Sequence, residues 1–297
     1  SITVSVEAVD NQSGLAQSGT YAYYKNGSLV ETSESNTCIY TGLTGGIEYE
    51  LKVIVKDQAG KTAERITSGT TKEPLPTVEE KLKEGDYVLY EDKSGYSHNC
   101  IVLYGPENTN YYSYGIQIIT QDLVEDVDLG KENNFTTSKT EYNTAISILN
   151  NKARNYLNTM YATDARCIGS EPDNPDYDGA SYDDQTGLKT SDNNYLTDYN
   201  KIEELGVNNI NSPYWLASRY LRRKGPAGEK PDISAGVRII DDGSEDYYLI
   251  CFVEENGEGS SKGYTQTAGL RPIFRLKDGI KIIDGSGKSY DPYILGI

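Results

Sequence analysis

Short stretches in which apolar and polar residues alternate are the feature that most constrains the fold of this chain. The apolar residues of ITVSVEAV (2–9) and of IEYELKVIVKD (47–57) fall on one face of an extended backbone. A period of two is typical of half-buried antiparallel strands. Between these runs, TYAYYKNGSLVE indicates a hairpin that turns at Asn26 and Gly27. Several short strands separated by turns predict a β-sandwich over residues 1–74.

The start of one of these strands carries a more specific signal. Leu43 is followed six residues later by Tyr49, which resembles the tyrosine corner of fibronectin type III and immunoglobulin-like domains. Residues 1–74 resemble the Ig-like or fibronectin type III-like modules that occur in tandem on bacterial surface proteins. This resemblance implies a spacer. The polar residues 75–84, within a stretch that has two prolines and alternating charge, predict a short linker.

A chain of 297 residues suits two domains, and residues 85–297 predict a second domain of the α+β class. Ser138 and Glu141 form a capping box ahead of an amphipathic helix. A second helix is predicted over 196–206, with Gly206 as its C-cap. Strand-like runs follow from Ser212 onward. The apolar stripe of the first helix comprises Tyr142, Ala145, Ile146, Leu149, Ala153, Tyr156, Leu157 and Met160.

The net charge excludes some classes of partner. It is −17 with no basic tract, which argues against nucleic acid and anionic membranes, because those partners are bound largely through Lys and Arg. The sequence has no run of about 18 apolar residues and no signal peptide, and it opens directly in a strand pattern. We therefore expect an excised ectodomain without direct membrane insertion.

Cysteine and histidine usage argues against a zinc site and against nucleophilic catalysis. Cys38, Cys100, Cys167 and Cys251 are isolated, with no CxxC pair. The only histidine, His98, lies in SGYSHNC, which is typical of a surface turn. The sequence therefore predicts no catalytic residue.

The densest acidic segment, EPDNPDYDGASYDD (171–184), is the best metal candidate. Asn174, Asp176 and Asp178 occupy alternate positions before a glycine, as in a calcium-binding loop. The first ligand is Asn rather than Asp, and Gln185 stands where a bidentate Glu is needed. A solvated acidic loop is favoured and no cofactor is predicted, with calcium at Asp176 and Asp178 left open.

An ordered set of phrases in residues 85–297 carries a family resemblance: AISILNNKARNYLNTMYATDARCIGS, TDYNKIEELGV, YWLASRY, GLRPIFRLKDGIKI and GSGKSYDPYILG. They resemble a C-terminal domain family of Firmicute and gut-bacterial surface proteins that often follows Ig-like modules. That family looks related to the C-type-lectin-like fold shared with formylglycine-generating-enzyme-like domains. The resemblance implies that WLASR and GLRP form neighbouring core strands beneath a loop-built binding face.

This resemblance has consequences for individual residues. It implies that Trp215, Leu216 and Ala217 belong to the core, and that Arg219 and Arg271 have structural roles, satisfied by buried or semi-buried carboxylates. In some relatives of the fold, the segment between the two phrases is diversified by retroelements that mutate adenines. Here that span is 220–268, and its many Lys and Glu codons are not products of such mutagenesis of asparagine codons.

The function predicted from the sequence is a secreted or cell-surface, non-enzymatic, ligand-binding protein of the adhesin or receptor type. A protein ligand is favoured over a glycan, and the segment 222–232 is predicted to be an irregular exposed loop. The alternatives are a polysaccharide-active enzyme and a structural surface or pilus component. Loops rich in aromatic and short polar residues are predicted to bind the ligand. The candidate residues are Tyr220, Arg222, Arg223, Lys224, Asp232, Ser234, Tyr247, Tyr248 and Tyr264.

Overall fold

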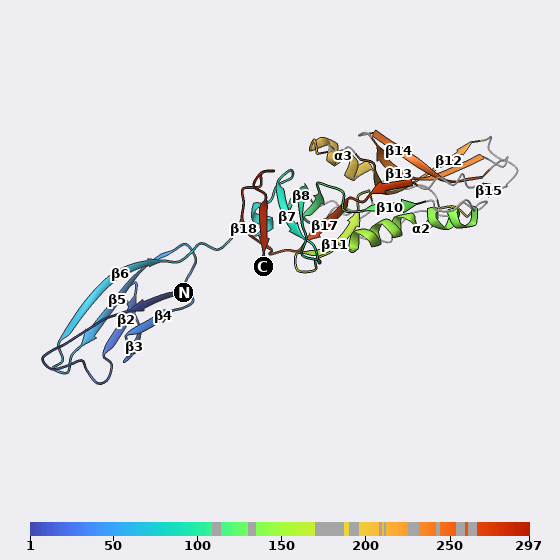
Figure 1. Cartoon of the computed structure of the whole chain (residues 1–297). Helices are drawn as coiled ribbons and strands as arrows, with labels where there is room; N and C mark the ends of the chain where they lie inside the picture. Colours follow the sequence, from blue (N-terminus) through green and yellow to red (C-terminus); the bar gives the residue numbers. More distant parts are fainter. Residues whose placement is uncertain are drawn as a thin grey trace. The chain divides into compact units, whose positions relative to one another are not determined.

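The computed structural model shows a chain of two compact units, Ser1–Leu75 and Pro76–Ile297. Strands make up 46% of it and helices 14%, which confirms a β-rich fold with several sheets (Figure 1). The structure describes residues 1–108, 114–129, 135–169, 187–189, 196–207, 210, 212–224, 232–241, 244–253, 259–260 and 266–297.

The first unit contains two antiparallel sheets. One pairs β1 (Ile2–Ser5) with β4 (Thr37–Tyr40). The other has the order β3 (Ser28–Ser33), β2 (Tyr21–Lys25), β5 (Glu48–Lys56), β6 (Thr62–Thr70). Alternate residues of β1, β2, β4 and β5 point inward, as the period of two predicts, whereas β3 and β6 are almost wholly exposed. The buried residues between the sheets are Tyr21, Tyr23, Cys38, Tyr40, Tyr49, Leu51 and Val53.

The predicted hairpin turn in this unit is confirmed, and Tyr49 makes a contact of the kind that its resemblance implies. Asn26 and Gly27 have φ angles of 48° and 77°, so both adopt the left-handed conformation that a two-residue hairpin requires. The hydroxyl of Tyr49 accepts a hydrogen bond of 2.9 Å from the backbone N–H of Thr44. A bond to the backbone a few residues upstream is the contact expected of a tyrosine corner.

The segment 75–84, predicted to be a linker, contains a short helix of the second unit, α1 (Val78–Lys81). The hydroxyl of Thr77 accepts a hydrogen bond from Glu80 N–H, while the Glu80 carboxylate accepts one from Thr77 N–H. Val78 and Leu82 are buried in the core of this unit. The linker is therefore shorter than predicted, because two apolar residues among charged ones anchor most of the segment.

In the described part of the second unit, a seven-stranded sheet has both faces buried. Alternate residues of its central strand enter different cores: Ile101 and Leu103 enter one, and Cys100 and Val102 the other. Among the described pairings of this sheet, that of β19 (Tyr293–Gly296) with β7 (Tyr87–Glu91) is the parallel one. The strand order is β11 (Ala162–Cys167), β17 (Pro272–Leu276), β9 (Gln117–Thr120), β8 (Ser97–Tyr104), β7 (Tyr87–Glu91), β19 (Tyr293–Gly296), β18 (Lys281–Asp284).

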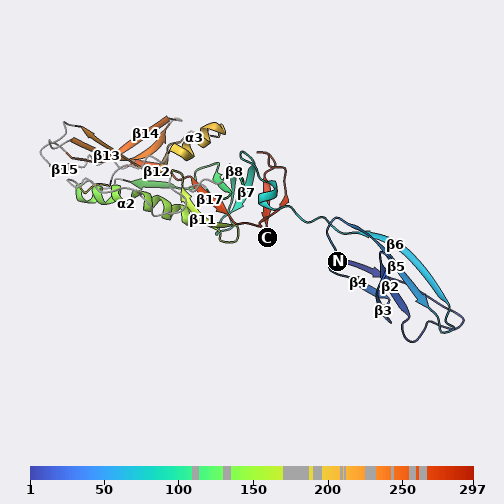
Figure 2. The same ribbon diagram turned by 180° about the vertical axis from the view of Figure 1, so that it is seen from behind.

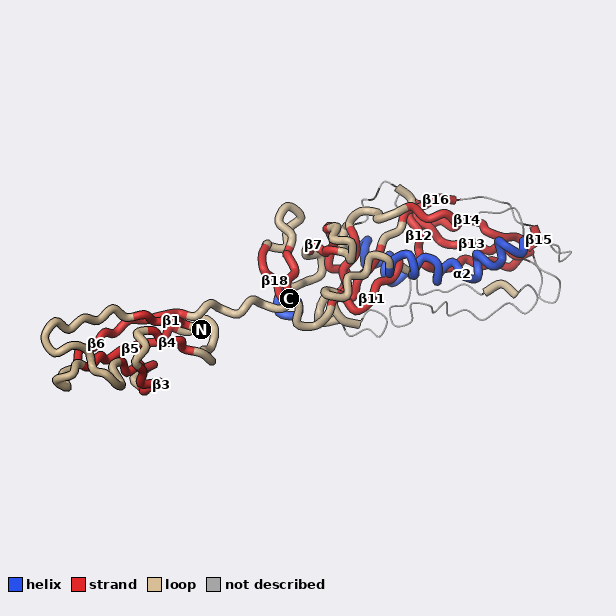
Figure 3. Tube along the Cα trace, turned by 60° about the horizontal axis from the view of Figure 1, so that its bottom comes forward, coloured by secondary structure: helices blue, strands red, loops and turns tan. Residues whose placement is uncertain are grey.

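A six-stranded sheet, again counted over described residues, carries the long strands of the C-terminal half. Its order is β10 (Asp126–Leu129), β16 (Gln266–Gly269), β12 (Tyr214–Lys224), β13 (Asp232–Asp241), β14 (Ser244–Val253), β15 (Gly259–Ser260). Helix α2 (Phe135–Arg154) contacts β12, β13 and β14 and runs along this sheet (Figures 2 and 3).

The two predicted helices exist, with differences at their ends. Tyr142, Ala145, Ile146, Leu149 and Ala153 are buried, as predicted. However, α2 begins at Phe135, so Ser138 lies inside the helix and is not its N-cap.

The chain leaves α2 after Arg154, before the last predicted residues of the stripe. Beyond the helix, Asn158 is anchored at β7: its backbone N–H donates to Tyr90 Oη at 2.7 Å and its side chain donates to the Glu91 carbonyl at 3.0 Å. Tyr156, two residues before Asn158, therefore lies beside the β7–β8 hairpin. Met160 is 57% exposed rather than packed.

Helix α3 (Leu196–Glu204) is followed by Gly206, whose φ of 66° confirms the predicted C-cap. A buried ion pair fixes this helix: Arg166 Nη1 lies 2.5 Å from the Asp198 carboxylate. Tyr104 Oη and the backbone N–H of Gly169 also donate to that carboxylate. In the described part of the chain, no helix combines the length and apolar character needed to cross a bilayer.

The phrases YWLASR and GLRP lie in the core, and the prediction for Trp215, Leu216 and Ala217 is confirmed, since all three are buried. Strands β12 and β16 are parallel neighbours that pair at Tyr214 and Gly269. A Cβ at Gly269 would lie 2.2 Å from Leu123 Cδ1, so a larger residue there would require the Leu123 side chain to move.

Candidate ligand-binding site

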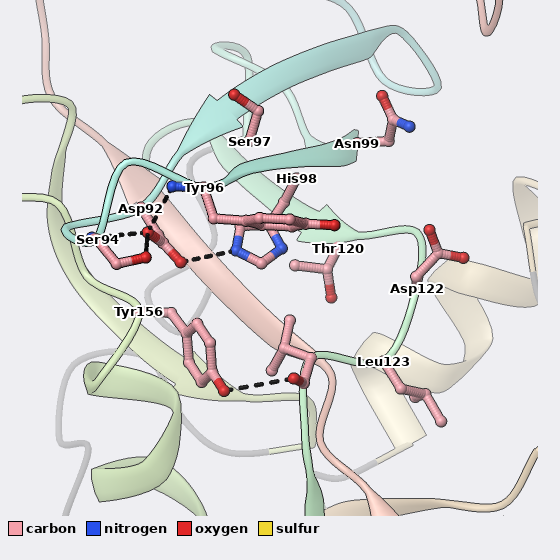
Figure 4. Close-up of a pocket in the computed structure, with 11 residues that line it drawn as sticks. Asp92, Ser94, Tyr96, Ser97, His98, Asn99, Thr120, Asp122, Leu123 and Tyr156 are labelled. Carbon is pink, nitrogen blue, oxygen red and sulfur yellow. Dashed lines mark hydrogen bonds and ion pairs between the residues drawn. The ribbon is translucent and has the colours of Figure 1, made fainter.

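A cavity of about 430 Å³ lies beside the hairpin formed by β7 and β8. Four parts of the chain meet there: the hairpin, the end of β9, the segment that follows β9, and the turn after α2 (Figure 4). Its volume is within the range typical of small-ligand sites. The lining residues are Asp92, Ser94, Tyr96, Ser97, His98, Asn99, Thr120, Asp122, Leu123, Val124 and Tyr156.

The carboxylate of Asp92 organises the hairpin turn. One oxygen accepts hydrogen bonds from Ser94 N–H at 2.7 Å, Ser94 Oγ at 2.6 Å and Tyr96 N–H at 3.2 Å. The other lies 3.0 Å from His98 Nε2. Burial raises the pKa of the Asp92 carboxyl, but the hydrogen bonds from Ser94, His98 and the backbone outweigh it and hold this pKa below its usual value.

The sequence suggested that His98 is a surface-turn residue, and the structure shows that it is not. It belongs to β8, opposite Tyr90, and its side chain is only 10% exposed. Since Asp92 accepts from Nε2, the neutral imidazole carries its proton on that nitrogen and Nδ1 is an acceptor. In the described structure Nδ1 has no hydrogen-bond partner, and the ring end that carries it points away from Asp92, to the side where Thr120 is drawn (Figure 4).

Aromatic rings enclose the imidazole. The ring of Tyr96 lies 4.8 Å from it, and that of Tyr156 lies 5.9 Å from it, both edge-to-face. Burial raises the pKa of Tyr156, so its hydroxyl stays protonated and donates to the Val124 carbonyl at 3.4 Å. Tyr96 is 65% exposed, which leaves much of its surface available to a ligand.

Thr120 supplies a polar atom without a partner. The residue is 1% exposed, and its Oγ1 is buried with no hydrogen bond in the structure. An unsatisfied buried hydroxyl costs about 1–3 kcal/mol. Thr120 lines the cavity, but Oγ1 itself has almost no accessible surface, so a ligand in the cavity would meet this hydroxyl once the side chain rotates to expose it.

The charge of the cavity is acidic. Asp92 and Asp122 line it, and the described lining contains no lysine or arginine. An anionic ligand would therefore meet uncompensated repulsion there.

The structure places the predicted ligand-binding residues elsewhere, on strands rather than loops. Tyr220 and Arg222 lie on β12, and Ser234 lies opposite Arg222 on β13. Arg222 is exposed, and the Arg238 guanidinium lies 5.4 Å from the ring centre of half-buried Tyr220. None of these described side chains lines the cavity.

For the other predicted residues on these strands, the structure describes only the position of the backbone. Arg223 pairs with Ile233 and Lys224 with Asp232, so the predicted loop over 222–232 is wrong at both of its ends. Tyr247 and Tyr248 lie on β14. Tyr264 and the proposed calcium ligands Asp176 and Asp178 fall outside the described residues. Within the described part, no cluster of His, Cys, Asp or Glu that could hold a metal ion occurs.

Arg271 has a structural role, but carboxylates do not satisfy it. Its Nε donates to the Thr120 carbonyl at 2.9 Å and its Nη2 to the Val207 carbonyl at 3.3 Å, while Nη1 is buried without a partner. Burial lowers the pKa of Arg271. Arg219 donates to the carbonyls of Tyr142 and Asn143, which attaches β12 to α2.

The site was missed because its residues are far apart in the sequence. Asp92, Ser94 and Tyr96 lie in the turn between β7 and β8 and only His98 lies on a strand, so the strand period does not group them; their signal is the cluster of polar residues in one turn. Thr120 and Tyr156 carry no comparable signal. Comparison with known proteins does not extend this description, since no protein-family model, curated protein or solved structure matches the chain.

Proposed function

We propose that the second unit is a non-enzymatic ligand-binding domain of a secreted or cell-surface protein, and that the cavity beside His98 takes a neutral sugar unit of a glycan. The observation that carries this proposal is the buried, unpartnered Thr120 hydroxyl in the cavity wall. A site built to hydrogen-bond a ligand leaves such a group unpaired until the ligand arrives.

The mixture of polar groups favours a ligand with several hydroxyls. His98 Nδ1 and the Asp122 carboxylate are acceptors, and the Thr120 hydroxyl both donates and accepts. A sugar hydroxyl also donates and accepts, so it matches each of these groups. The rings of Tyr96 and Tyr156 offer flat apolar surface for the C–H face of a pyranose. The absence of cations in the described lining favours a neutral sugar over an acidic one.

The wider architecture supports a surface location. The Tyr49 to Thr44 hydrogen bond and the antiparallel sheets of the first unit agree with the predicted Ig-like or fibronectin type III-like spacer. The parallel contact between the WLASR and GLRP strands agrees with the predicted C-type-lectin-like resemblance. Fold alone does not establish function, so the proposal depends on the cavity.

Binding of methyl glycosides to the full chain tests this proposal. The panel is glucoside, galactoside, mannoside and N-acetylglucosaminide, measured by saturation-transfer NMR and calorimetry. At roughly −0.3 kcal/mol per ligand atom, a single pyranose should bind with a Kd on the order of 1 mM. Thr120→Val should weaken the binding of the best glycoside about tenfold by removing one hydrogen bond.

Stability measurements separate binding from folding. Thr120→Val removes an unpaired hydroxyl, so it should leave the free energy of unfolding unchanged or slightly higher. Thr163→Val is the matched control, because Thr163 is an exposed residue of β11 outside the cavity lining. The proposal fails if no glycoside of the panel binds, or if Thr120→Val binds as well as the unaltered chain.

A further inference from the structure

We infer that protonation of His98 controls the sugar site: the cavity binds its glycan while the imidazole is neutral and releases the glycan when the imidazole becomes charged. This inference rests on the proposed function, because it concerns the same cavity and the same ligand. His98 lines that cavity and is the only histidine among the 297 residues of the chain. Imidazole is the side-chain group that ordinarily changes its charge between pH 5 and 8. A single residue therefore makes the site sensitive to pH within that range.

The two ring nitrogens of His98 have different surroundings. Nε2 lies 3.0 Å from a carboxylate oxygen of Asp92, and it carries a proton in both the neutral and the charged imidazole. Nδ1 has no hydrogen-bond partner among the described residues and points away from Asp92 (Figure 4). Protonation therefore leaves the contact with Asp92 in place and adds its proton at Nδ1, the nitrogen that a ligand in the cavity would meet.

The added proton changes what the cavity offers to a neutral sugar. In the neutral imidazole, Nδ1 accepts a hydrogen bond from a sugar hydroxyl, and in the charged form this acceptor is lost. The charged ring also depends more strongly on hydration, and a ligand that fills the cavity removes water from it. A neutral sugar carries no charge that could replace this hydration. The complex therefore favours the neutral imidazole, and the affinity for the sugar falls with the pH.

The groups packed around the imidazole leave His98 as the residue that changes charge. Burial raises the pKa of the Asp92 carboxyl, but hydrogen bonds from neighbouring side chains and the backbone outweigh burial and lower this pKa, so Asp92 stays ionised. Tyr90 lies opposite His98 on β7, and Tyr156 lies against the ring. Burial raises the pKa of both tyrosines, so their hydroxyls stay protonated. The third tyrosine at the imidazole is Tyr96, at 4.8 Å.

Charged groups on the other neighbouring elements act on the imidazole in the empty cavity. They are the Asp122 carboxylate in the lining, Glu125 with Lys152 at 3.2 Å, and Arg271, which donates to the Thr120 carbonyl. The carboxylates of Asp92 and Asp122 favour the charged imidazole, whereas the Arg271 guanidinium disfavours it. Lys152 offsets the charge of Glu125. The cavity can therefore hold the extra proton when it is empty, and the proton and the sugar compete for the same lone pair of Nδ1.

This competition sets the direction and the size of the effect. Because one proton is involved, the affinity falls by at most about tenfold for each pH unit. By the same linkage, a bound glycoside makes protonation of the imidazole less favourable by the factor by which protonation weakens binding. The effect is therefore measurable both in the Kd of the glycoside and in the titration of the imidazole.

Titrations of the full chain at several pH values test this inference. The probe is the methyl glycoside of the panel that binds best at about pH 7.5, and its Kd is measured by NMR at intervals down to about pH 5. The imidazole C–H resonance is followed in the same samples. Because the chain has one histidine, this resonance is assigned without ambiguity when no histidine tag is attached. Backbone spectra at each pH check that the chain stays folded.

We expect the Kd to rise at least about fivefold from pH 7.5 to pH 5, along the same curve as the protonation of the imidazole. Saturating glycoside should move the midpoint of that protonation to lower pH. Since Nε2 keeps its contact with Asp92 in both states, the folded structure should persist over this range.

Two variants identify the group that is responsible. His98→Gln has no titrating group at this position, so it should bind more weakly and with the same Kd at every pH. Asp122→Asn is the matched control, because it removes an exposed carboxylate of the lining and leaves the imidazole. It should retain the loss of affinity in acid. If His98→Gln binds too weakly to measure, the shift of the imidazole midpoint in the unaltered chain and in Asp122→Asn decides the question.

The contrary results separate this inference from the proposed function. A Kd that stays constant or decreases while the imidazole becomes protonated would overturn control by His98 and leave the sugar site intact. The same conclusion follows if the dependence on pH persists in His98→Gln or disappears in Asp122→Asn. Failure of every glycoside to bind at any pH would overturn both the control by His98 and the proposed function.

Discussion

Trp215 and His98 are each the only residue of their type in the chain, and the structure places them in opposite settings. Trp215 lies in a strand whose residues Tyr214 to Arg219 are all buried, and its Nε1 donates to the Val127 carbonyl at 2.8 Å. His98 lies on a polar hairpin, yet it faces a cavity and has an acceptor nitrogen without a partner. The aromatic stretch holds the fold together, while the polar hairpin provides the site.

This difference shows how well the polarity of a short stretch of sequence predicts whether its side chains are exposed. A continuous buried run such as YWLASR arises where α2 and the neighbouring strands cover the strand. The polar residues around His98 predict a surface turn, because the apolar run that follows them forms the next strand and does not fold back over the turn. Here Tyr156, which follows α2 and lies two residues before Asn158, covers the imidazole and converts that turn into a cavity wall.

The largest effect in this comparison is expected from Trp215→Ala. Removing a fully buried indole should cost about 3–5 kcal/mol of the free energy of unfolding, through lost transfer energy and the resulting cavity. Differential scanning calorimetry of the full chain measures it, with the transition of the first unit as internal reference. Tyr290→Ala, at an 86% exposed position, should change stability by less than about 0.5 kcal/mol. Equal effects of the two variants would contradict a core role for Trp215.

Local chemistry explains which parts of the fold were predictable. The hairpin at Asn26 and Gly27 and the C-cap at Gly206 were predicted, because each depends on the left-handed conformation of one or two residues. The strand ends at Arg222 to Lys224 were missed, since a run of charged residues has the composition of a loop. The start of α2 was also missed, because Ser138 can cap a helix or lie within one.

The site was less predictable than the fold. Its essential contacts join the hairpin to Thr120 and Tyr156, and no periodicity links positions so far apart. The nine predicted ligand residues followed a compositional signal, aromatic and short polar residues, which marks exposed strands as well as binding loops. The Thr120 hydroxyl became a signal only when its burial and its missing partner were visible together.

A smaller effect, specific to the hairpin, is expected from Asp92→Asn. The hydrogen bonds that lower the pKa of Asp92 in the folded state stabilise the fold at pH values above the unfolded pKa of about 3.9. This contribution is lost as the pH falls through the lower, folded-state pKa. Asp92→Asn should cost about 1–2 kcal/mol of the free energy of unfolding at pH 7, and this difference from the unaltered chain should shrink toward zero in acid. Urea unfolding at pH 7 and at progressively lower pH measures both values.

The matched control for Asp92 lies in the first unit. Asp10 accepts hydrogen bonds from Ser13 Oγ at 2.6 Å and from the backbone N–H groups of Gln12 and Ser13, a similar arrangement in a more exposed turn. Asp10→Asn should leave the unfolding of the second unit unchanged at every pH. If Asp10→Asn and Asp92→Asn change the free energy of unfolding of the second unit by the same amount, with the same dependence on pH, the Asp92 network has no special role.

The smallest effect on stability and the most specific effect on binding are expected from His98→Gln. The Gln amide can still donate to Asp92, so the free energy of unfolding should fall by less than about 1 kcal/mol. The acceptor at Nδ1 is lost, however, and the affinity for the best glycoside should fall about tenfold. His98→Asn gives the converse test, because its shorter side chain retains a polar group near Nδ1 but cannot reach Asp92 at its 3.0 Å position. It should therefore lose more stability and less affinity than His98→Gln. If both variants lose stability and affinity in the same proportion, the imidazole serves only to hold the hairpin, and the contrast between a structural Trp215 and a ligand-binding His98 disappears.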